Sequence, residues 1–264
     1  PPRSTPLYSS AASDVYKRQK EHLERFERSL KYLDLDPGLS MKQLETITEE
    51  VVERNLPLLA SGHDYWVTQR VTRGLTEDDG QAWPDWPEST VLVECTPLPL
   101  AARAHYYRDG IQIITPSVRR VAPEMASPRA KTHNYLNFVM GDLEVQSQNP
   151  DALSVLLDKN GNLAEGKGSN IFVIKNQKLV TPKEKYVLPG VSREVTMNLG
   201  RELGYEIEED DIDLFDAYNA DELFITSTSF CICPVQSING RRPSANGVPG
   251  PITSKLINAY VDLV

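Results

Sequence analysis

Apolar and polar positions in the N-terminal part of the chain follow the periods of two helices and then of two strands. Residues 20–33 carry Leu and Phe at three- and four-residue intervals between charged side chains, which predicts an amphipathic helix. Ser40 is placed to cap a second helix that we expect to end near Asn55. Residues 65–71 and 90–96 are rich in Val, Thr, Trp and Tyr, which favour strands.

The rest of the chain mixes short strands with helices. Asp158-Lys-Asn-Gly161 predicts a hairpin turn. Residues 97–104 contain two prolines and small side chains, and they predict a linker. The other predicted elements are strands at residues 110–115, 171–174, 179–181 and 223–226 and helices at residues 193–203 and 251–264. This order argues against a doubly wound parallel sheet and predicts an α+β, or mixed α/β, fold.

Composition is that of an ordinary globular protein. The chain has 264 residues, of which 40% are hydrophobic and 25% charged, enough for two modest domains. A net charge of −9 argues against nucleic acid as a partner, because phosphate binding needs an excess of Lys and Arg. No apolar run approaches the roughly 20 residues that a membrane span requires, so we expect no membrane partner.

The three cysteines form no redox or metal-binding motif. Cys231 and Cys233 are separated by one residue, and no histidine is near them in the sequence. We therefore expect these two residues and Cys95 to be small core side chains. We also expect no bound metal and a reducing, cytoplasmic location.

Residues 1–19 do not resemble the start of a folded domain. They hold three prolines and many Ser and Ala with little periodicity, and they lack the apolar core of a signal peptide. The string DVYKRQ at residues 14–19 matches the in-frame translation of a transposase mosaic-end sequencing adapter. We expect a non-native leader over residues 1–19; a natural disordered tail is the alternative.

Lys131 is the lysine most suggestive of chemistry. It follows a proline turn and precedes Tyr135, Leu136 and Phe138, whose spacing suits a buried helix. A lysine at that junction either reaches into solvent or is held in a pocket. If it is held, desolvation makes it a candidate nucleophile or base.

The segment from Gly161 to Lys167 imitates a phosphate-binding P-loop. The eighth position of that motif should be Ser or Thr and is Gly168, and the segment leads into the strand-like run Asn170-Ile-Phe-Val-Ile. A P-loop must instead open a helix. A different interpretation of Glu165 is a buried carboxylate between apolar residues and glycines that admit a flat ligand; a solvated turn glutamate is the alternative.

Two further segments could hold an anion. Gly190-Val-Ser192 enters a helix N-terminus, where amides are free, although a serine there is commonly only a cap. Thr226-Ser-Thr-Ser229 offers hydroxyls at a strand end. A lysine, a carboxylate and an anion site together suit a ligand with an aldehyde, a ring nitrogen and a phosphate, which describes pyridoxal 5′-phosphate.

Five motifs carry a resemblance to a known family. They are His22-Leu-Glu-Arg25, Lys131-Thr-His-Asn-Tyr135-Leu, Glu165-Gly-Lys-Gly-Ser-Asn170-Ile-Phe, Leu188-Pro-Gly-Val-Ser-Arg193 and Thr226-Ser-Thr228. From about Glu21 to the C-terminus the chain resembles the class IV, or fold-type IV, pyridoxal-phosphate aminotransferases. That family includes branched-chain aminotransferases, D-amino acid transaminases and aminodeoxychorismate lyases.

The resemblance implies a role for each motif. Lys131 is similar to the lysine that forms the Schiff base and moves the Cα proton, and Glu165 to the partner of the pyridine nitrogen. Tyr135 is expected to hydrogen-bond the ring 3-oxygen, and Leu188 to pack on the ring. The residues expected to hold the phosphate are Arg25, Val191, Ser192 and Thr228. The substrate carboxylate is expected at Ser227 and Ser229, with Arg73 as a further candidate.

The resemblance also implies domains and partners. We expect a truncated small α/β domain with its linker over residues 20–105 and a β-rich pseudo-barrel domain with surrounding helices, which binds the cofactor, over residues 106–264. The family suggests a homodimer whose substrates are an amino acid and a 2-oxo acid. Trp83 and Trp86 would lie at the pocket or interface, or in the core.

Asn134-Tyr135-Leu136-Asn137 is most similar to the branched-chain group, which implies amino transfer to 2-oxoglutarate by a ping-pong mechanism. Two departures leave the donor open. The family's opening strands have no counterpart before His22, and the segment after Arg73 lacks the Arg-x-His pair of D-amino acid transaminases; Arg70 is another candidate for the carboxylate arginine. The alternatives are a D-amino acid or (R)-amine transaminase, a lyase similar to aminodeoxychorismate lyase, or a truncated relic that binds ligand without catalysis.

Overall fold

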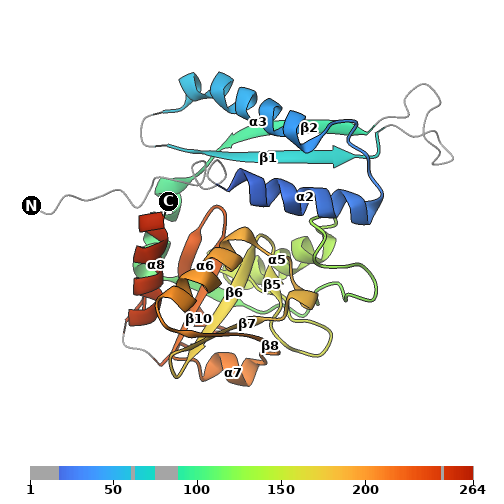
Figure 1. Cartoon of the computed structure of the whole chain (residues 1–264). Coiled ribbons are helices and arrows are strands. Elements are labelled where there is room, and N and C mark those ends of the chain that lie inside the picture. The colour runs from blue at the N-terminus through green and yellow to red at the C-terminus, as the bar shows by residue number, and fades with distance from the viewer. Residues whose placement is uncertain (1–17, 61–62, 75–88, 245–246, 264) are drawn as a thin grey trace, which may run out of the picture. The chain divides into compact units, whose positions relative to one another are not determined.

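The computed structural model describes residues 18–60, 63–74, 89–244 and 247–263. The chain forms two compact units, Pro1–Leu100 and Ala101–Val264 (Figure 1). We expected a leader over residues 1–19. Residues 1–17 of it lie outside the described residues, and Gln19 is the first residue of the first helix. Trp83 and Trp86 also lie outside the described residues.

The first unit is built from two helices and a hairpin. Its elements are α2 (Gln19–Leu33), α3 (Met41–Asn55), the short 3₁₀ helix η1 (Leu56–Leu58), β1 (Tyr65–Thr72) and β2 (Thr90–Pro97). The predicted cap is confirmed, because Gln43 N donates to Ser40 Oγ (3.2 Å) and Ser40 N donates to Gln43 Oε1 (2.9 Å). α3 packs on the antiparallel pair β1–β2, where Val52, Tyr65 and Val67 are buried together.

The second unit is built around an eight-stranded mixed sheet with the strand order β4-β3-β10-β9-β6-β7-β8, in which β5 pairs with β6. The strands are β3 (Ile111–Ile114), β4 (Leu153–Ser154), β5 (Glu165–Gly166), β6 (Ser169–Lys175), β7 (Lys178–Pro182), β8 (Glu206–Asp210), β9 (Glu222–Ser227) and β10 (Cys231–Ile238). The pairs β10–β3, β3–β4 and β7–β8 are parallel and the other pairs are antiparallel, which confirms the mixed fold.

The helices of this unit are α4 (Leu100–Asp109), α5 (Leu136–Gln148), α6 (Val191–Glu202), α7 (Leu214–Tyr218) and α8 (Pro251–Leu263), with the 3₁₀ helix η2 (Glu184–Tyr186). α6 and α8 pack on one face of the sheet, where Phe172 and Phe224 stack with centroids 4.8 Å apart and Tyr260 is buried beside them. A second core lies on the other face, so alternate residues of β6 and β9 face opposite layers.

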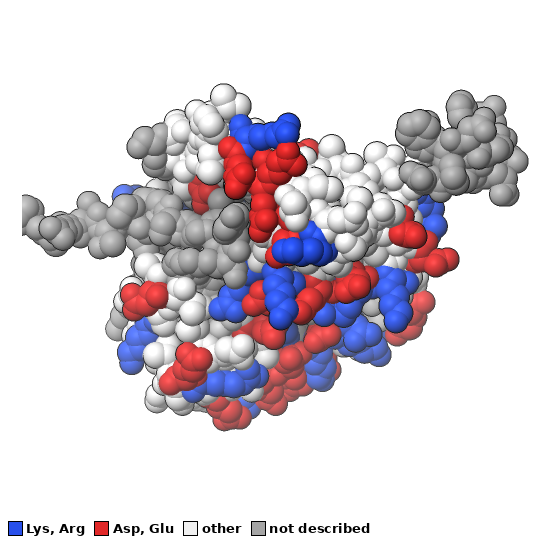
Figure 2. Space-filling model, turned by 45° about the horizontal axis from the view of Figure 1, so that its top comes forward, with Lys and Arg blue, Asp and Glu red and all other residues white. Residues whose placement is uncertain are grey.

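Charged side chains of both signs share the surface (Figure 2). Several ion pairs join β7 and its flanks to the acidic edge strand β8: Lys178 pairs with Glu206 and Glu208, and Lys183 with Asp210 and Asp211. Charges on an edge strand discourage pairing with another chain. No described helix has the length and apolar character of a membrane span. The described residues also contain no His, Cys, Asp and Glu cluster suited to a metal ion.

Three sequence-based expectations were wrong in detail. Residues 100–109 form α4 rather than a linker, because Pro97 and Pro99 precede the helix and do not interrupt it. β10 was not predicted; it contains Pro234, which normally argues against a strand, and its pairing with β3 shifts register just after it. Of the cysteines, only Cys233 is buried, where burial raises the pKa of its thiol to about 12, while Cys95 and Cys231 are half-buried.

Candidate active site

Strand register brings two of the sequence motifs to the same place. Glu165 on β5 pairs with Asn170 on β6, Asn170 pairs with Thr226 on β9, and Thr226 pairs with Ile232 on β10. The glutamate motif therefore lies in line with the start of the hydroxyl-rich segment, residues 226–229, although the two are far apart in the sequence. Neighbouring strands are about 5 Å apart, which is the scale of a small ligand.

Glu165 is buried, with 4% of its surface exposed, so it is not a solvated turn glutamate. Its Oε1 accepts a hydrogen bond from Arg120 Nε (2.8 Å), and its Oε2 accepts one from Leu188 N (2.9 Å). Burial raises the pKa of Glu165 above its ordinary value, and Arg120, the Leu188 amide and the Lys131 charge limit that rise. Three separate groups thus favour the ionised carboxylate against the cost of desolvation.

Arg120 is a site residue that the sequence did not reveal. Its guanidinium carbon lies 4.8 Å from the centroid of the Phe138 ring, and its backbone N donates to Leu157 O (2.8 Å). The only signal in the sequence was indirect: a buried carboxylate needs a cation, and Arg120 is one of many arginines that could supply it.

Leu188 connects the carboxylate to the start of α6. Its N–H donates to Glu165, and its carbonyl accepts from Asn170 Nδ2 (3.0 Å). Gly190 is required beside it, because a Cβ at that position would lie 2.3 Å from Asn170 Oδ1. These contacts fix the N-terminus of α6 against the end of the sheet that carries Glu165.

Ser192 is not the cap of α6. The N-cap is Gly190, which supplies no side-chain hydrogen bond, and Ser192 is the second residue of the helix. The Ser192 hydroxyl accepts from Tyr260 Oη (3.2 Å), and its carbonyl accepts from Thr196 Oγ1 (2.8 Å). The amides of the first turn thus have no side-chain cap, and a helix N-terminus of this kind attracts anions.

The hydroxyl-rich segment ends β9 and turns into β10. Ser227 pairs with Cys231, so residues 228–230 form a three-residue connection, with Cys231 at φ 55°. Ser227 Oγ accepts from Phe230 N (3.0 Å) and lies 3.5 Å from Ser229 Oγ. Thr228 and Ser229 are half-buried, so their side chains remain reachable from solvent.

Lys131 and Tyr135 precede α5 rather than entering a buried helix. α5 begins at Leu136, buries Phe138 and Val145, and leaves other apolar side chains exposed, so the expected buried helix was wrong. Lys131 is exposed, yet its positive charge limits the rise in the pKa of Glu165. Its ammonium therefore lies close enough to that carboxylate to interact with it electrostatically. The half-buried Tyr135 ring packs 5.8 Å from that of Phe138, the residue that also contacts Arg120.

The remaining predicted residues belong to the first unit. Arg25 is buried on α2, and its Nη2 lies 3.3 Å from His22 Nδ1. Arg73 donates to the carbonyls of Leu33 (2.5 Å) and Asp34 (3.2 Å) at the C-terminus of α2. Arg70 pairs with Glu94 (2.5 Å). Both candidates for the carboxylate arginine therefore have partners within their own unit.

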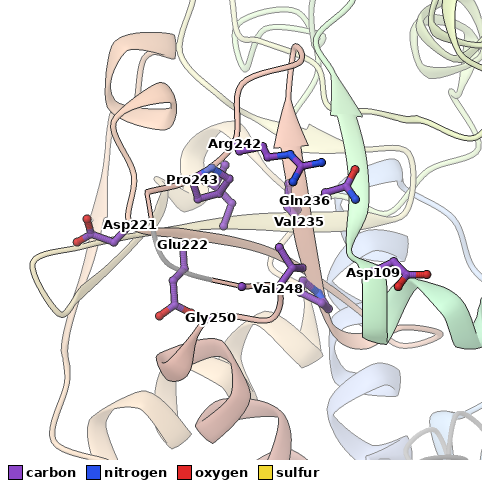
Figure 3. Close-up of a pocket in the computed structure, with 12 residues that line it drawn as sticks. Asp109, Asp221, Glu222, Val235, Gln236, Arg242, Pro243, Val248 and Gly250 are labelled. Carbon is purple, nitrogen blue, oxygen red and sulfur yellow. The ribbon is translucent and has the colours of Figure 1, made fainter.

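A cavity of about 260 Å³ lies elsewhere in the second unit (Figure 3). Its lining includes Asp221 and Glu222 at the start of β9 and Gln236 and Arg242 at and beyond the end of β10. These positions are at the opposite end of β9 and β10 from the turn at residues 228–230. None of the predicted site residues lines this cavity.

A buried glutamate beside an uncapped helix N-terminus, on a mixed sheet flanked by helices, defines a site suited to a planar, phosphorylated cofactor. The residues present fit such a group, because a fixed anion and an anion-binding helix end are held together by Leu188. The model of the amino-transferase class IV family matches residues 13–238. The chain belongs to the class IV aminotransferases.

Relatives and solved structures agree with this assignment. The chain is 35% identical over 245 residues to a putative branched-chain-amino-acid aminotransferase of Methanocaldococcus jannaschii, covering 92% of this chain and 81% of that protein. It is 28% identical to the branched-chain-amino-acid aminotransferase of Escherichia coli strain K12, covering 97% and 81%. The branched-chain amino acid aminotransferase from Thermobaculum terrenum, in its holo form with PLP, superposes with a TM-score of 0.81 at 25% identity, covering 93% and 78%.

Several sequence-based predictions are thereby confirmed. The chain has the fold of the fold-type IV enzymes and is a pyridoxal-phosphate-dependent aminotransferase similar to branched-chain aminotransferases. Its cofactor is pyridoxal 5′-phosphate, and a further structural neighbour was solved with pyridoxamine 5′-phosphate. The roles of individual site residues, the acceptor and the assembly are proposals.

The Arg120–Glu165 pair yields a prediction about stability and pH. Arg120→Met removes the main partner of a buried carboxylate and should cost about 3–5 kcal/mol of unfolding free energy near neutral pH. Burial already holds the pKa of Glu165 above its ordinary range in the folded wild type, and loss of Arg120 raises it further, so the folded variant holds its proton to higher pH than the folded wild type or the unfolded chain. The loss should therefore grow as pH rises above the ordinary range of a carboxyl group and shrink below it.

Urea unfolding at about pH 5 and about pH 8 measures this effect. Arg119→Met, at the exposed neighbouring position, is the matched control and should show little loss at either pH. Adding Glu165→Gln to Arg120→Met should restore part of the stability. A loss that is the same at both pH values and is not relieved in the double variant would contradict the assigned pairing.

Proposed function

We propose that the chain transfers an amino group between a branched-chain amino acid and 2-oxoglutarate in a ping-pong cycle. The observation that carries the proposal is the buried Glu165, held by Arg120 and by the Leu188 amide at the start of α6. Relatives and structural neighbours named as branched-chain aminotransferases support the donor class. In a ping-pong cycle the donor leaves as a keto acid before the acceptor enters the same site.

The cofactor supplies an aldehyde and an electron-withdrawing ring when it is bound. Glu165 would hold the proton on the ring nitrogen, because an ionised carboxylate favours the protonated pyridine. Tyr135 would donate a hydrogen bond to the ring 3-oxygen, and Leu188 would pack on the ring. The residues proposed to hold the phosphate are Arg25, Val191, Ser192 and Thr228.

Lys131 would bind the aldehyde through its Nζ and then carry the proton from Cα of the amino acid. A lysine suits both tasks, because its unprotonated amine is a nucleophile and a base. Its exposed position before α5 leaves the side chain room to move between them. The positive charge it places near Glu165 also favours the carboxylate that the ring nitrogen needs.

Ser227 and Ser229 are the proposed contacts for the substrate carboxylate. Ser227 ends β9 and Ser229 lies in the turn that follows, so both offer hydroxyls just beyond Thr226, the residue in line with Glu165 across the sheet. Arg73 is a weaker candidate for this role than the sequence indicated, because its guanidinium already binds two carbonyls at the end of α2.

We also propose a homodimer in the cytoplasm. α5 exposes an apolar stripe of Leu136, Val139, Met140 and Leu143 at helical spacing, which suits burial against a second copy. The cysteines Cys95, Cys231 and Cys233 are all free, which fits a reducing compartment.

Lys131→Ala should abolish covalent attachment of the cofactor. The purified variant should lose the yellow absorbance that wild type shows with pyridoxal phosphate, and transamination of leucine should fall by at least about a hundredfold. Absorbance spectra and a coupled leucine assay measure the two effects.

Lys167→Ala is the matched control, since Lys167 is an exposed lysine two residues from Glu165 whose Nζ lies 3.4 Å from Asp142 Oδ2. It should keep both colour and activity. A wild-type protein that stays colourless with added cofactor, or a yellow Lys131→Ala protein, would rule out the assignment of this lysine.

A donor screen tests the substrate class. Leucine and valine should be the best donors with 2-oxoglutarate as acceptor, and D-alanine and an (R)-amine should react poorly. Formation of glutamate is the measurement, with a parallel reaction that lacks the acceptor. Preference for D-alanine or the amine would contradict the branched-chain assignment. Continuous product release without a keto acid would indicate a lyase, and no turnover of any donor would indicate a binding protein.

A further inference from the structure

One face of α4 is directed at the turn that follows β9. Arg103, Tyr106 and Tyr107 are spaced three and four residues apart, so they share one side of the helix. All three contact Phe230, which lies in the turn between Ser227 and Cys231. This contact was hidden in the sequence, where residues 97–104, including Arg103, were predicted to be a linker.

The contacts are specific. Tyr107 Oη donates to the carbonyl of Phe230 (2.7 Å), and Arg103 Nη1 donates to the carbonyl of Ser229 (3.4 Å). The Arg103 guanidinium carbon lies 4.4 Å from the centroid of the Phe230 ring, and the Tyr106 ring meets the same ring edge-on at 6.2 Å. Two backbone groups and one side chain of the turn are thus held from a single helix.

These contacts fix the orientation of the turn. Because peptide bonds are planar, holding the carbonyls of Ser229 and Phe230 also fixes the N–H groups that share their peptide planes. The N–H of Phe230 is used within the turn, where it donates to Ser227 Oγ (3.0 Å). The following residue, Cys231, adopts φ 55°, a conformation that a non-glycine residue keeps only when its surroundings hold it.

Arg103 brings a positive charge to this turn. It is half-buried and forms no ion pair with any residue that the structure describes. The ionisable groups that act on it are Tyr106, Tyr107 and Cys233, none of which is a carboxylate. Burial lowers the pKa of its guanidinium, which is the cost of a partly desolvated cation without a carboxylate partner.

We propose that Arg103 and Tyr107 clamp the turn at residues 228–230 and that the charge of Arg103 makes this turn select ligands with a carboxylate. Tyr107 is a positioning residue, because it acts through the Phe230 carbonyl. Arg103 acts in two ways: it holds the Ser229 carbonyl, and its positive charge attracts a carboxylate. The inference rests on the proposed function, in which Ser227 and Ser229 receive the substrate carboxylate. Arg103 would supply the positive charge for that carboxylate, since Arg70 and Arg73 are already engaged by partners within their own unit.

Binding of a carboxylic acid and of its neutral amide tests the proposal. The ligands are 4-methylvaleric acid, which a structural neighbour binds, and 4-methylvaleramide, titrated into the full chain loaded with pyridoxal phosphate. Arg103→Met should weaken binding of the acid by about tenfold and leave the amide almost unchanged. Arg103→Lys keeps the charge and should recover most of the affinity for the acid.

Tyr107→Phe removes only the hydroxyl and should weaken binding of the acid severalfold. Arg108→Met is the matched control, because Arg108 is an exposed arginine of the same helix that binds only its neighbour Asp109 in the described chain. It should leave both affinities unchanged. Thermal unfolding and the cofactor spectrum of each variant are recorded in parallel.

Equal loss of both ligands in Arg103→Met, or failure of Arg103→Lys to recover the acid, would show that the clamp has only a structural role. Unchanged affinity for the acid in both Arg103→Met and Tyr107→Phe would overturn the proposal while leaving the proposed function intact. A wild-type chain that binds no pyridoxal phosphate would overturn both.

Discussion

A carboxylate that is buried in a protein must be compensated, and the compensation of Glu165 organises this site. Arg120 supplies a charge and a hydrogen bond, and the Leu188 amide supplies a second hydrogen bond. The carbonyl of the same leucine is held by Asn170, and Gly190 leaves space for that side chain. The arrangement thus fixes the anion and the N-terminus of α6 together, so the two anchors proposed for the cofactor cannot shift independently.

The sheet supplies the rest of the alignment. β5, β6, β9 and β10 place Glu165, Asn170, Thr226 and Ile232 in one row, and the turn that α4 contacts begins two residues beyond Thr226. A proposed carboxylate site at that turn and a proposed nitrogen partner at Glu165 would then be positioned by one rigid element. Lys131 precedes α5 and is exposed, which suits the one residue that has to move during the proposed reaction.

Local signals explain which features the sequence could predict. The Ser40 cap and the hairpin turn at Asp158 depend on neighbouring residues, and both were found. Glu165 and Gly190 could be singled out because a family motif carries them. Arg120 and Arg103 could not, because their importance comes from contacts with residues distant in the sequence. Pro234 concealed β10, and the prolines before α4 concealed that helix.

The most direct test of the central claim is the single-turnover reaction of Glu165→Ala loaded with pyridoxal phosphate and given leucine. If Glu165 holds the proton on the ring nitrogen, the variant should retain the cofactor but react at least about a hundredfold more slowly than wild type. Cofactor absorbance and unfolding of the variant, followed in parallel, separate this effect from loss of the cofactor or of the fold. A variant that binds the cofactor and reacts at the wild-type rate would contradict the account.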